Sequence, residues 1–311
     1  MIRASIDIGS NSVLLLIGEY DDKTGFKEIA SESRVTGLGR GLNKTKAFAE
    51  ESMKETYLAI KEYVELAEGL SIDSKDIIIT ATEASRVATN SEDFFNRITS
   101  KLDIVIHIIS GEGEAYYTAL GVCRLAKSKE VITIIDIGGA STEIMKVKCK
   151  SFKVLDSISL AVGSVRATEW IKDNTFNEEI NMAASSIKDD RFNCSEAIFV
   201  AGTMTSLAAI ILGLTTFESS KIGSEAISFK KLTKFIKSLS SFDEETLLDQ
   251  YPVLGKRASS IVGGGEVAIF LGEKLKLENL TISPYGLRYG TLIEGSLEEN
   301  YVERHFRPEN S

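Results

Sequence analysis

The stretch IDIGSNS at residues 6–12 returns later in the chain as IDIGGAS at residues 135–141. In both copies an apolar run ends in Asp-Ile-Gly, the chain turns tightly, and a second apolar run begins at a serine. Each copy opens three β-rich runs, over 2–8, 12–20 and 26–35 and again over 131–137, 141–148 and 152–159. The repeat predicts two similarly folded lobes, over 1–127 and 128–311; the alternative is two unrelated glycine turns.

Helical and β-rich segments alternate through the rest of the chain. Apolar residues at helical spacing predict a long amphipathic helix over 45–68, and further helices are expected near 83–101 and over 111–126. The remaining β-rich runs lie over 76–81, 104–109 and 197–201, with mostly helical sequence after the last of them. This alternation predicts an α/β fold built from layers of strands and helices.

The composition narrows the class of protein. Of 311 residues, 43% are hydrophobic and 26% are charged, which is typical of a globular chain and excludes a disordered one. The net charge of −9 argues against general nucleic-acid binding, so a polyanionic substrate would have to meet a local basic pocket. The apolar runs are too short to span a membrane, and the N-terminus shows no apolar signal core. We therefore expect a cytoplasmic protein with no membrane or nucleic-acid partner.

The few cysteines and histidines exclude several kinds of site. The three cysteines are widely spaced and form no Cys-x-x-Cys, and the chain has only two histidines. This pattern excludes a zinc finger and disfavours a histidine-based triad. No GxxxxGK[ST] string occurs, which excludes a P-loop nucleotide site.

The two glycine turns are suited to holding phosphate. A strand–turn–strand with glycine and serine at its tip exposes backbone N–H groups and hydroxyls that can cradle an anion. Asp7 and Asp136 stand just before the two turns, where each could hold Mg²⁺ directly or through waters. A third loop, at residues 200–205, ends a strand and opens a helix, which also favours an anion. A glycine cluster at residues 261–266 indicates either close helix packing or ligand contact.

Three charged residues are candidates for chemistry. Glu114 lies in the first turn of a predicted helix, where the helix dipole favours the ionised carboxylate that can accept a proton from water. Glu143 follows the second glycine turn, and Arg86 could pair with a phosphate. The alternatives are an ordinary acidic helix start for Glu114 and a solvated strand charge for Glu143.

Five motifs in order resemble the signatures of the Ppx/GppA phosphatase family, the exopolyphosphatases and guanosine pentaphosphate phosphohydrolases. They are SIDIGSNS at 5–12, ISGxxEA at 109–115, IDIGGxSTE at 135–143, AGTxT at 201–205 and YGLRYG at 285–290. The resemblance extends over about residues 2–295. It implies an actin-like (sugar kinase/Hsp70-type) fold of two ribonuclease-H-like lobes around a central cleft. The chain resembles the short, two-lobe form, in which the last helix, over about 286–298, packs on the first lobe.

The resemblance also implies an activity and a cofactor. It implies Mg²⁺-dependent (or Mn²⁺-dependent) hydrolysis that removes a terminal phosphate from inorganic polyphosphate or from guanosine pentaphosphate (pppGpp). The sequence does not separate these two substrates, and the family allows a homodimer. Two other functions remain open: an ATP-binding phosphotransferase or ATPase of the same fold, and a non-catalytic sensor of polyphosphate or nucleotide. The Ser-Gly-x-x-Glu motif favours water as the acceptor, and the presence of all three acidic site residues argues against a sensor.

The motifs assign roles to individual residues. Glu114 matches the glutamate that activates the attacking water, and Glu143 matches a second catalytic glutamate. The metal side would be Asp136 and Glu143, with Asp7 as a further candidate. The phosphate-binding candidates, including Arg86, are Ser10, Asn11, Ser12, Gly138, Gly139, Ser141, Thr142, Gly202 and Thr203.

The chain departs from the family pattern at three positions. Ala140 and Ala201 each stand where the family usually has glycine, and a methyl group narrows the range of φ. Gly37 stands where the family often has arginine, with Arg40 displaced from that position. We expect these departures to bear on how the substrate is held.

Overall fold

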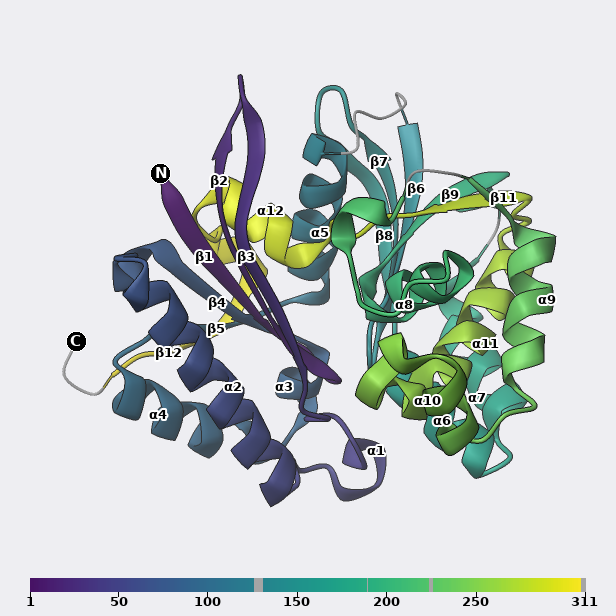
Figure 1. The fold of residues 1–311 in the computed structure, drawn as a ribbon, viewed down its shortest axis with the longest axis horizontal. Helices are drawn as coiled ribbons and strands as arrows, with labels where there is room; N and C mark the ends of the chain where they lie inside the picture. The colour runs from purple at the N-terminus through teal and green to yellow at the C-terminus, as the bar shows by residue number, and fades with distance from the viewer. Residues whose placement is uncertain (126–130, 189, 224–225, 309–311) are drawn as a thin grey trace. The chain divides into compact units, whose positions relative to one another are not determined.

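The computed structural model describes residues 1–125, 131–188, 190–223 and 226–308. The chain forms two compact units, one made of Met1–Leu125 with Leu287–Ser311 and the other of Ala126–Gly286 (Figure 1). The predicted boundary near residue 127 lies outside the described residues. Each unit is α/β, which confirms the predicted fold class. Among the described residues, no helix has both the length and the apolar character needed to cross a bilayer.

The first unit is built on a six-stranded sheet in the order β12-β5-β4-β1-β2-β3. Its strands are β1 Ile2–Ile8, β2 Ser12–Asp21, β3 Gly25–Val35, β4 Ile77–Ala81, β5 Ile106–Ile109 and β12 Val302–Phe306. Strands β1, β4 and β5 run parallel, so their carboxyl ends lie at one edge of the sheet. The other pairings are antiparallel.

The second unit repeats this topology strand for strand. Its order is β10-β11-β9-β6-β7-β8, with β6, β9 and β11 parallel and the other pairings antiparallel. Its strands are β6 Val131–Ile137, β7 Thr142–Lys148, β8 Lys153–Leu160, β9 Glu196–Val200, β10 Ile227–Ser228 and β11 Asn279–Ile282. The two IDIG stretches therefore end the corresponding central strands, β1 and β6.

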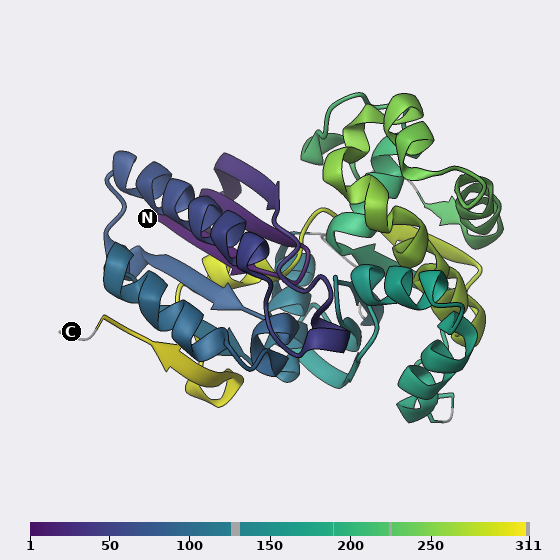
Figure 2. The same cartoon turned by 90° about the horizontal axis from the view of Figure 1, so that it is seen from below.

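Two pairs of helices, α2 with α4 and α5 with α12, belong to the first unit. Helices α2 Glu50–Gly69 and α4 Ser91–Leu102 lie side by side, and α2 also packs against β1 and β2 (Figures 1 and 2). Helix α5 Gly111–Leu125 packs against α12 Leu287–Glu294. A Cβ at Gly290 of α12 would lie 1.8 Å from the carbonyl oxygen of Tyr117 on α5. Only glycine permits this approach, which brings the chain beyond the second unit back against the first.

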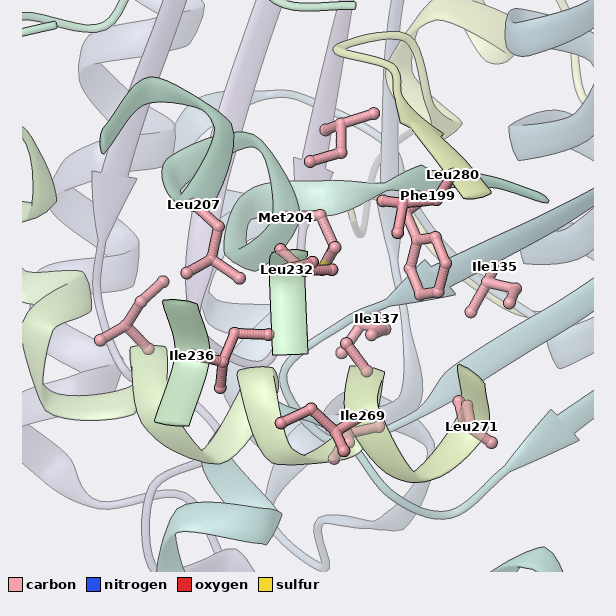
Figure 3. Close-up of a cluster of buried hydrophobic side chains, with 14 of the residues drawn as sticks. Ile135, Ile137, Phe199, Met204, Leu207, Leu232, Ile236, Ile269, Leu271 and Leu280 are labelled. Atoms are coloured by element: carbon pink, nitrogen blue, oxygen red, sulfur yellow. The ribbon is translucent and has the colours of Figure 1, made fainter. Parts of the chain in front are cut away.

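The second unit has a core formed by strands β6, β9 and β11 and by three long helices. These are α8 Ala201–Ile211, α9 Phe229–Leu239 and α11 Ala258–Lys274 (Figure 3). The predicted glycine cluster lies in the middle of α11 and allows close packing. A Cβ at Gly263 would lie 2.3 Å from Oγ1 of Thr168 on α6 Ser164–Lys172, and one at Gly265 would lie 2.6 Å from Ile236 on α9. The remaining helices of the unit are α7 Phe176–Ala183 and α10 Glu244–Gln250.

Several element boundaries differ from the prediction. The helix expected over 45–68 begins at Glu50, because the chain before it forms a short helix, α1 Leu42–Thr45, that ends at a left-handed Lys46 (φ 57°). The helices expected near 83–101 are α3 Glu83–Val87 and α4. The short strands β10, β11 and β12 were not predicted. They have two, four and five residues, which is too few for a periodic pattern to show.

Candidate active site

The first glycine turn joins β1 to β2, and hydrogen bonds from a neighbouring segment hold it in place. The amide of Gly9 donates to the carbonyl oxygen of Ser12 at 3.0 Å and closes the turn. The carbonyl oxygens of Ser10 and Asn11 accept hydrogen bonds of 2.7 and 3.0 Å from amides of the segment 36–39, which follows β3. In the described part of the chain, the amides of Ser10 and Asn11 themselves donate no hydrogen bond. The turn therefore holds its carbonyls against the protein and leaves two N–H groups available.

The second glycine turn joins β6 to β7 and has the same arrangement. The amide of Gly138 donates to the carbonyl oxygen of Ser141 at 3.0 Å. The carbonyl oxygens of Gly138 and Gly139 accept hydrogen bonds of 2.9 and 2.8 Å from amides of the segment 164–166, the start of α6. Within the described ranges, the amides of Gly139 and Ala140 donate none. Successive available N–H groups in a tight turn form a concave site for an anion such as phosphate.

The segment that holds each turn has a glycine, Gly39 or Gly163, at the point where its backbone comes closest to the turn. A Cβ at Gly163 would lie 2.5 Å from the carbonyl carbon of Gly139. A Cβ at Gly39 would lie 2.9 Å from Cβ of Ser10. Both distances are shorter than van der Waals contact, so each bracing segment depends on its glycine to reach the turn.

Glu114 and Arg86 meet at the carboxyl ends of β4 and β5. Glu114 lies in the first turn of α5 and is buried, and its Oε2 is 2.7 Å from Nη1 of Arg86. Arg86 also donates to the carbonyl oxygen of Ile109 at 2.6 Å and to Oε2 of Glu83 at 2.9 Å. Burial by itself lowers the pKa of Arg86, but the two carboxylates outweigh burial and raise that pKa above its ordinary value. The guanidinium is thus permanently charged and favours the ionised form of Glu114.

The predicted contact of Arg86 with phosphate is still a prediction. The guanidinium carries five N–H donors, and three are accounted for by its protein partners, so donors remain for a further oxygen. Asp7 lies half-buried on β1 of the same unit, opposite Leu14 of β2 and Thr80 of β4. Because β1, β4 and β5 are parallel, Asp7, Arg86 and Glu114 come from one edge of the sheet, the usual place for a ligand.

The second unit places two carboxylates directly opposite each other. Asp136 of β6 pairs in register with Glu143 of β7, a relation that sets Cβ atoms about 4.5–5.5 Å apart. Glu143 is 3% exposed, and its Oε1 accepts a hydrogen bond of 2.7 Å from Oγ of Ser159. Opposed carboxylates repel each other unless a cation stands between them. The described residues hold no group of three or more His, Cys, Asp or Glu arranged for a metal. Two carboxylates do fit Mg²⁺, which completes its ligand shell with waters and substrate phosphates.

Two predicted phosphate ligands of the second unit have structural contacts. Thr142 is fully buried and its hydroxyl donates to the carbonyl oxygen of Val162 at 2.6 Å, so that proton is not available to a ligand. Thr203 lies in the first turn of α8 and is buried beside Gly264, whose Cβ would come within 2.5 Å of it. Of the predicted hydroxyls on the turns, Ser10 and Ser141 are buried at the tips.

Two arginines that stand beside the loops were not predicted as ligands. A Cβ at Gly202 would lie 3.0 Å from Nε of Arg257, so this guanidinium packs on the start of α8. The guanidinium of Arg40 lies 3.3 Å from where a Cβ of Gly37 would be. Gly37 has a left-handed φ of 65°, a backbone conformation that disfavours an arginine at that position. Arg40 stands between two glycines in the sequence, Gly39 and Gly41, which is a signal that points to it, whereas Arg257 is distant from Gly202 in the chain and no local pattern indicates their contact.

Comparison with known proteins agrees with this geometry. The family model of the Ppx/GppA phosphatase family matches residues 16–299. The chain therefore belongs to the Ppx/GppA phosphatase family, as the five motifs predict, and has the actin-like fold of that family.

Individual relatives cover nearly all of the chain. It is 32% identical to a bifunctional 3-dehydroquinate synthase/phosphatase of Fusobacterium nucleatum over 94% of its own length, and it spans only 46% of that relative. It is 26% identical to exopolyphosphatase 2 of Mycobacterium tuberculosis, covering 93% of the chain and 97% of that relative. The crystal structure of the Aquifex aeolicus family member matches with a TM-score of 0.76 and 29% identity, over 97% of this chain and 99% of that one.

Proposed function

We propose that this protein hydrolyses the terminal phosphoanhydride bond of inorganic polyphosphate or pppGpp and releases orthophosphate. The observation that carries the proposal is the pair of matching turns, each with its carbonyls held from behind and two amides available. Such a turn suits a phosphate group, and polyphosphate and pppGpp consist of or carry linked phosphates. The relative of nearly equal length is named an exopolyphosphatase, which supports the polyphosphate arm of the proposal.

Glu114 is proposed to act as the general base. Water attacks the terminal phosphorus, the bond from that phosphorus to the bridging oxygen breaks, and Glu114 accepts the proton of the water. The products are orthophosphate and a chain shorter by one phosphate. Arg86 fixes the carboxylate at 2.7 Å and keeps it ionised, and the amides of the two turns offset charge on the phosphate oxygens. General-base catalysis of this kind contributes about 10²–10⁴-fold in rate.

Asp136 and Glu143 are proposed to hold Mg²⁺, or Mn²⁺ in its place. Their opposed positions on β6 and β7 supply the hard oxygen ligands that such an ion prefers. When bound, the ion would neutralise charge on the phosphates. Leu14 lies opposite Asp7 in register. A metal ion bound in the first unit would therefore have one carboxylate ligand, Asp7, with waters as further ligands.

Phosphate release tests the proposal. Tripolyphosphate, long-chain polyphosphate, pppGpp and ATP are compared with and without Mg²⁺, using the wild type, Glu114→Gln and Glu112→Gln. Glu112 is exposed on the same first turn of α5, so its substitution is a matched control for the loss of one charge. We expect Mg²⁺-dependent release that falls about 10²–10⁴-fold in Glu114→Gln and is unchanged in Glu112→Gln.

Other outcomes favour the other functions. Turnover of ATP alone would indicate an ATPase of the same fold. Binding of these ligands without release would indicate a sensor. Equal activity of the two variants would remove Glu114 from the mechanism.

A further inference from the structure

A basic groove lies between α2 and α4, on helices that contribute no residue to the proposed active site. It has a volume of about 300 Å³, at the lower end of the range of small-ligand sites. The two helices lie side by side (Figures 1 and 2). The groove is lined by Glu50, Met53, Lys54 and Tyr57 from α2 and by Phe94, Arg97, Ile98 and Lys101 from α4.

The spacing of these residues shows that one face of each helix forms the groove. On both helices the lining positions follow i, i+3, i+4 and i+7, which is a single stripe of an α-helix. Phe94 and Ile98 are buried and form an apolar floor, while Lys54, Arg97 and Lys101 are exposed at the rim.

The cations at the rim outnumber the one carboxylate that lines the groove. Three cations face one carboxylate, Glu50, and no ion pair joins any of the three to an acidic group in the described part of the chain. Arg97 and Lys101 are four residues apart on one helix face, where like charges destabilise the helix. The Nζ of Lys101 lies over the ring of Tyr57, 5.5 Å from its centre, which directs this cation into the groove.

We propose that this groove binds an oligophosphate chain at a site separate from the proposed catalytic residues. Cations on adjacent helical turns have Cβ atoms about 5–6 Å apart, a spacing that lets them contact different phosphates of one linked chain. Single orthophosphate engages fewer of the cations and binds more weakly. The chain can belong to inorganic polyphosphate or to a nucleoside polyphosphate, since both carry linked phosphates.

The test counts binding sites for inorganic tripolyphosphate by equilibrium dialysis without Mg²⁺. It compares the wild type with the triple variant Lys54→Ala, Arg97→Ala, Lys101→Ala. The matched control is Lys230→Ala, Lys234→Ala, Lys237→Ala on α9, which removes three exposed lysines with the same charge change outside the groove. All six residues are exposed, so both variants should fold, which circular dichroism checks.

We expect the groove variant to lose one binding site that the α9 variant keeps. Arg97→Ala alone should weaken that site about tenfold, the usual scale for one charge-assisted contact. Orthophosphate should bind it more weakly than tripolyphosphate, and comparison with GTP identifies which source of the chain is preferred. Equal loss of binding in the two triple variants, or no loss in either, would overturn the proposal. Because the site is counted by binding, this result does not depend on whether the protein hydrolyses phosphate.

Discussion

The two glycine turns share a backbone and differ in their charged neighbours. Each closes through a 3.0 Å hydrogen bond from its first glycine, and each has its carbonyls held by the segment that follows the third strand of its meander. Opposite the aspartate, however, the first unit has Leu14 where the second has Glu143. The repeat thus preserves the geometry of the turns, and each unit adds its own chemistry: Glu114 with Arg86 in the first, two opposed carboxylates in the second.

Among the substitutions that compare the two units, the largest effect is expected from making the second unit resemble the first. Glu143→Leu should fold, because leucine fills the corresponding position in the first unit, and it should lose Mg²⁺-dependent phosphate release by about 10²–10³-fold. Release assays at several Mg²⁺ concentrations measure the effect. Ser159→Ala is the control, since it removes only the hydrogen bond to Glu143. Activity within tenfold of wild type would show that the second carboxylate is not needed.

The bracing glycines should differ in how much they contribute to stability. In Gly163→Ala the new methyl meets backbone atoms at 2.5 Å, and we expect a loss of about 3 kcal/mol in the free energy of unfolding. In Gly39→Ala it meets the side chain of Ser10 at 2.9 Å, and we expect a loss of about 1 kcal/mol. Urea unfolding measures both. Equal losses, or a larger loss at Gly39, would contradict the account of how the turns are braced.

The two units should also respond differently to acid at their edge strands. Burial, followed by the charge of nearby His305 and Arg307, lowers the pKa of His107 to about 4, and Glu299 opposes the shift only weakly. The folded state therefore takes up this proton less readily than the unfolded chain, in which a histidine has a pKa near 6.5. The stabilisation from neutral His107 is complete above pH 6.5 and is lost as the pH falls towards 4.

We expect the stabilisation from neutral His107 to fall by about 2 kcal/mol over this pH range, a value reduced to allow for the partial exposure of the side chain. His107→Gln should show a correspondingly smaller decline in unfolding free energy between pH 7 and 4.5. Parallel pH profiles for the two proteins would refute the prediction. The corresponding edge of the second unit, where β10 pairs with β11, contains no titratable side chain.

The smallest expected effect concerns Ala201 and Ala140, the two alanines that stand where the family usually has glycine, and it should differ between them. Ala201 has a left-handed φ of 72°, so Ala201→Gly should relieve strain and stabilise the protein by about 1 kcal/mol, raising Tm by about 2–4 °C. Ala140 does not lie in the left-handed region, so Ala140→Gly should give no gain. Thermal unfolding of both variants is the measurement. A gain at Ala140 and none at Ala201 would reverse this interpretation.

Much of the fold could be predicted from the sequence because its central strands are long and bounded by glycine turns. The paired IDIG stretches predicted the two meanders, and strand bounds such as Ile2–Ile8 and Val131–Ile137 agree with the structure. The edge strands could not be predicted. Strand β12, with the sequence VERHF, has three polar residues in a row and so lacks the alternating pattern of a strand. It pairs with β5, nearly 200 residues earlier in the chain, a long-range partner that no local pattern reveals.

The candidate site was predictable as a set of residues but not as a set of contacts. Spacing could place Glu114 at the start of a helix, but only the folded sheet shows that Arg86 pairs with it and also holds Ile109 and Glu83. The hydroxyl of Thr142 matches the family pattern and is nevertheless directed to a backbone carbonyl. Arg257 and Arg40 were missed as ligand candidates because each reaches a loop through a packing contact with a glycine.

The proposed function depends above all on whether the available amides of both turns bind phosphate. The most direct test records amide chemical shifts by NMR of the Glu114→Gln variant as tripolyphosphate and Mg²⁺ are added. We expect the amides of Ser10, Asn11, Gly139 and Ala140 to shift together, with smaller changes at Gly9 and Gly138, whose amides are already bonded within their turns. Saturable shifts confined to one turn, or absent from both, would contradict the proposed function.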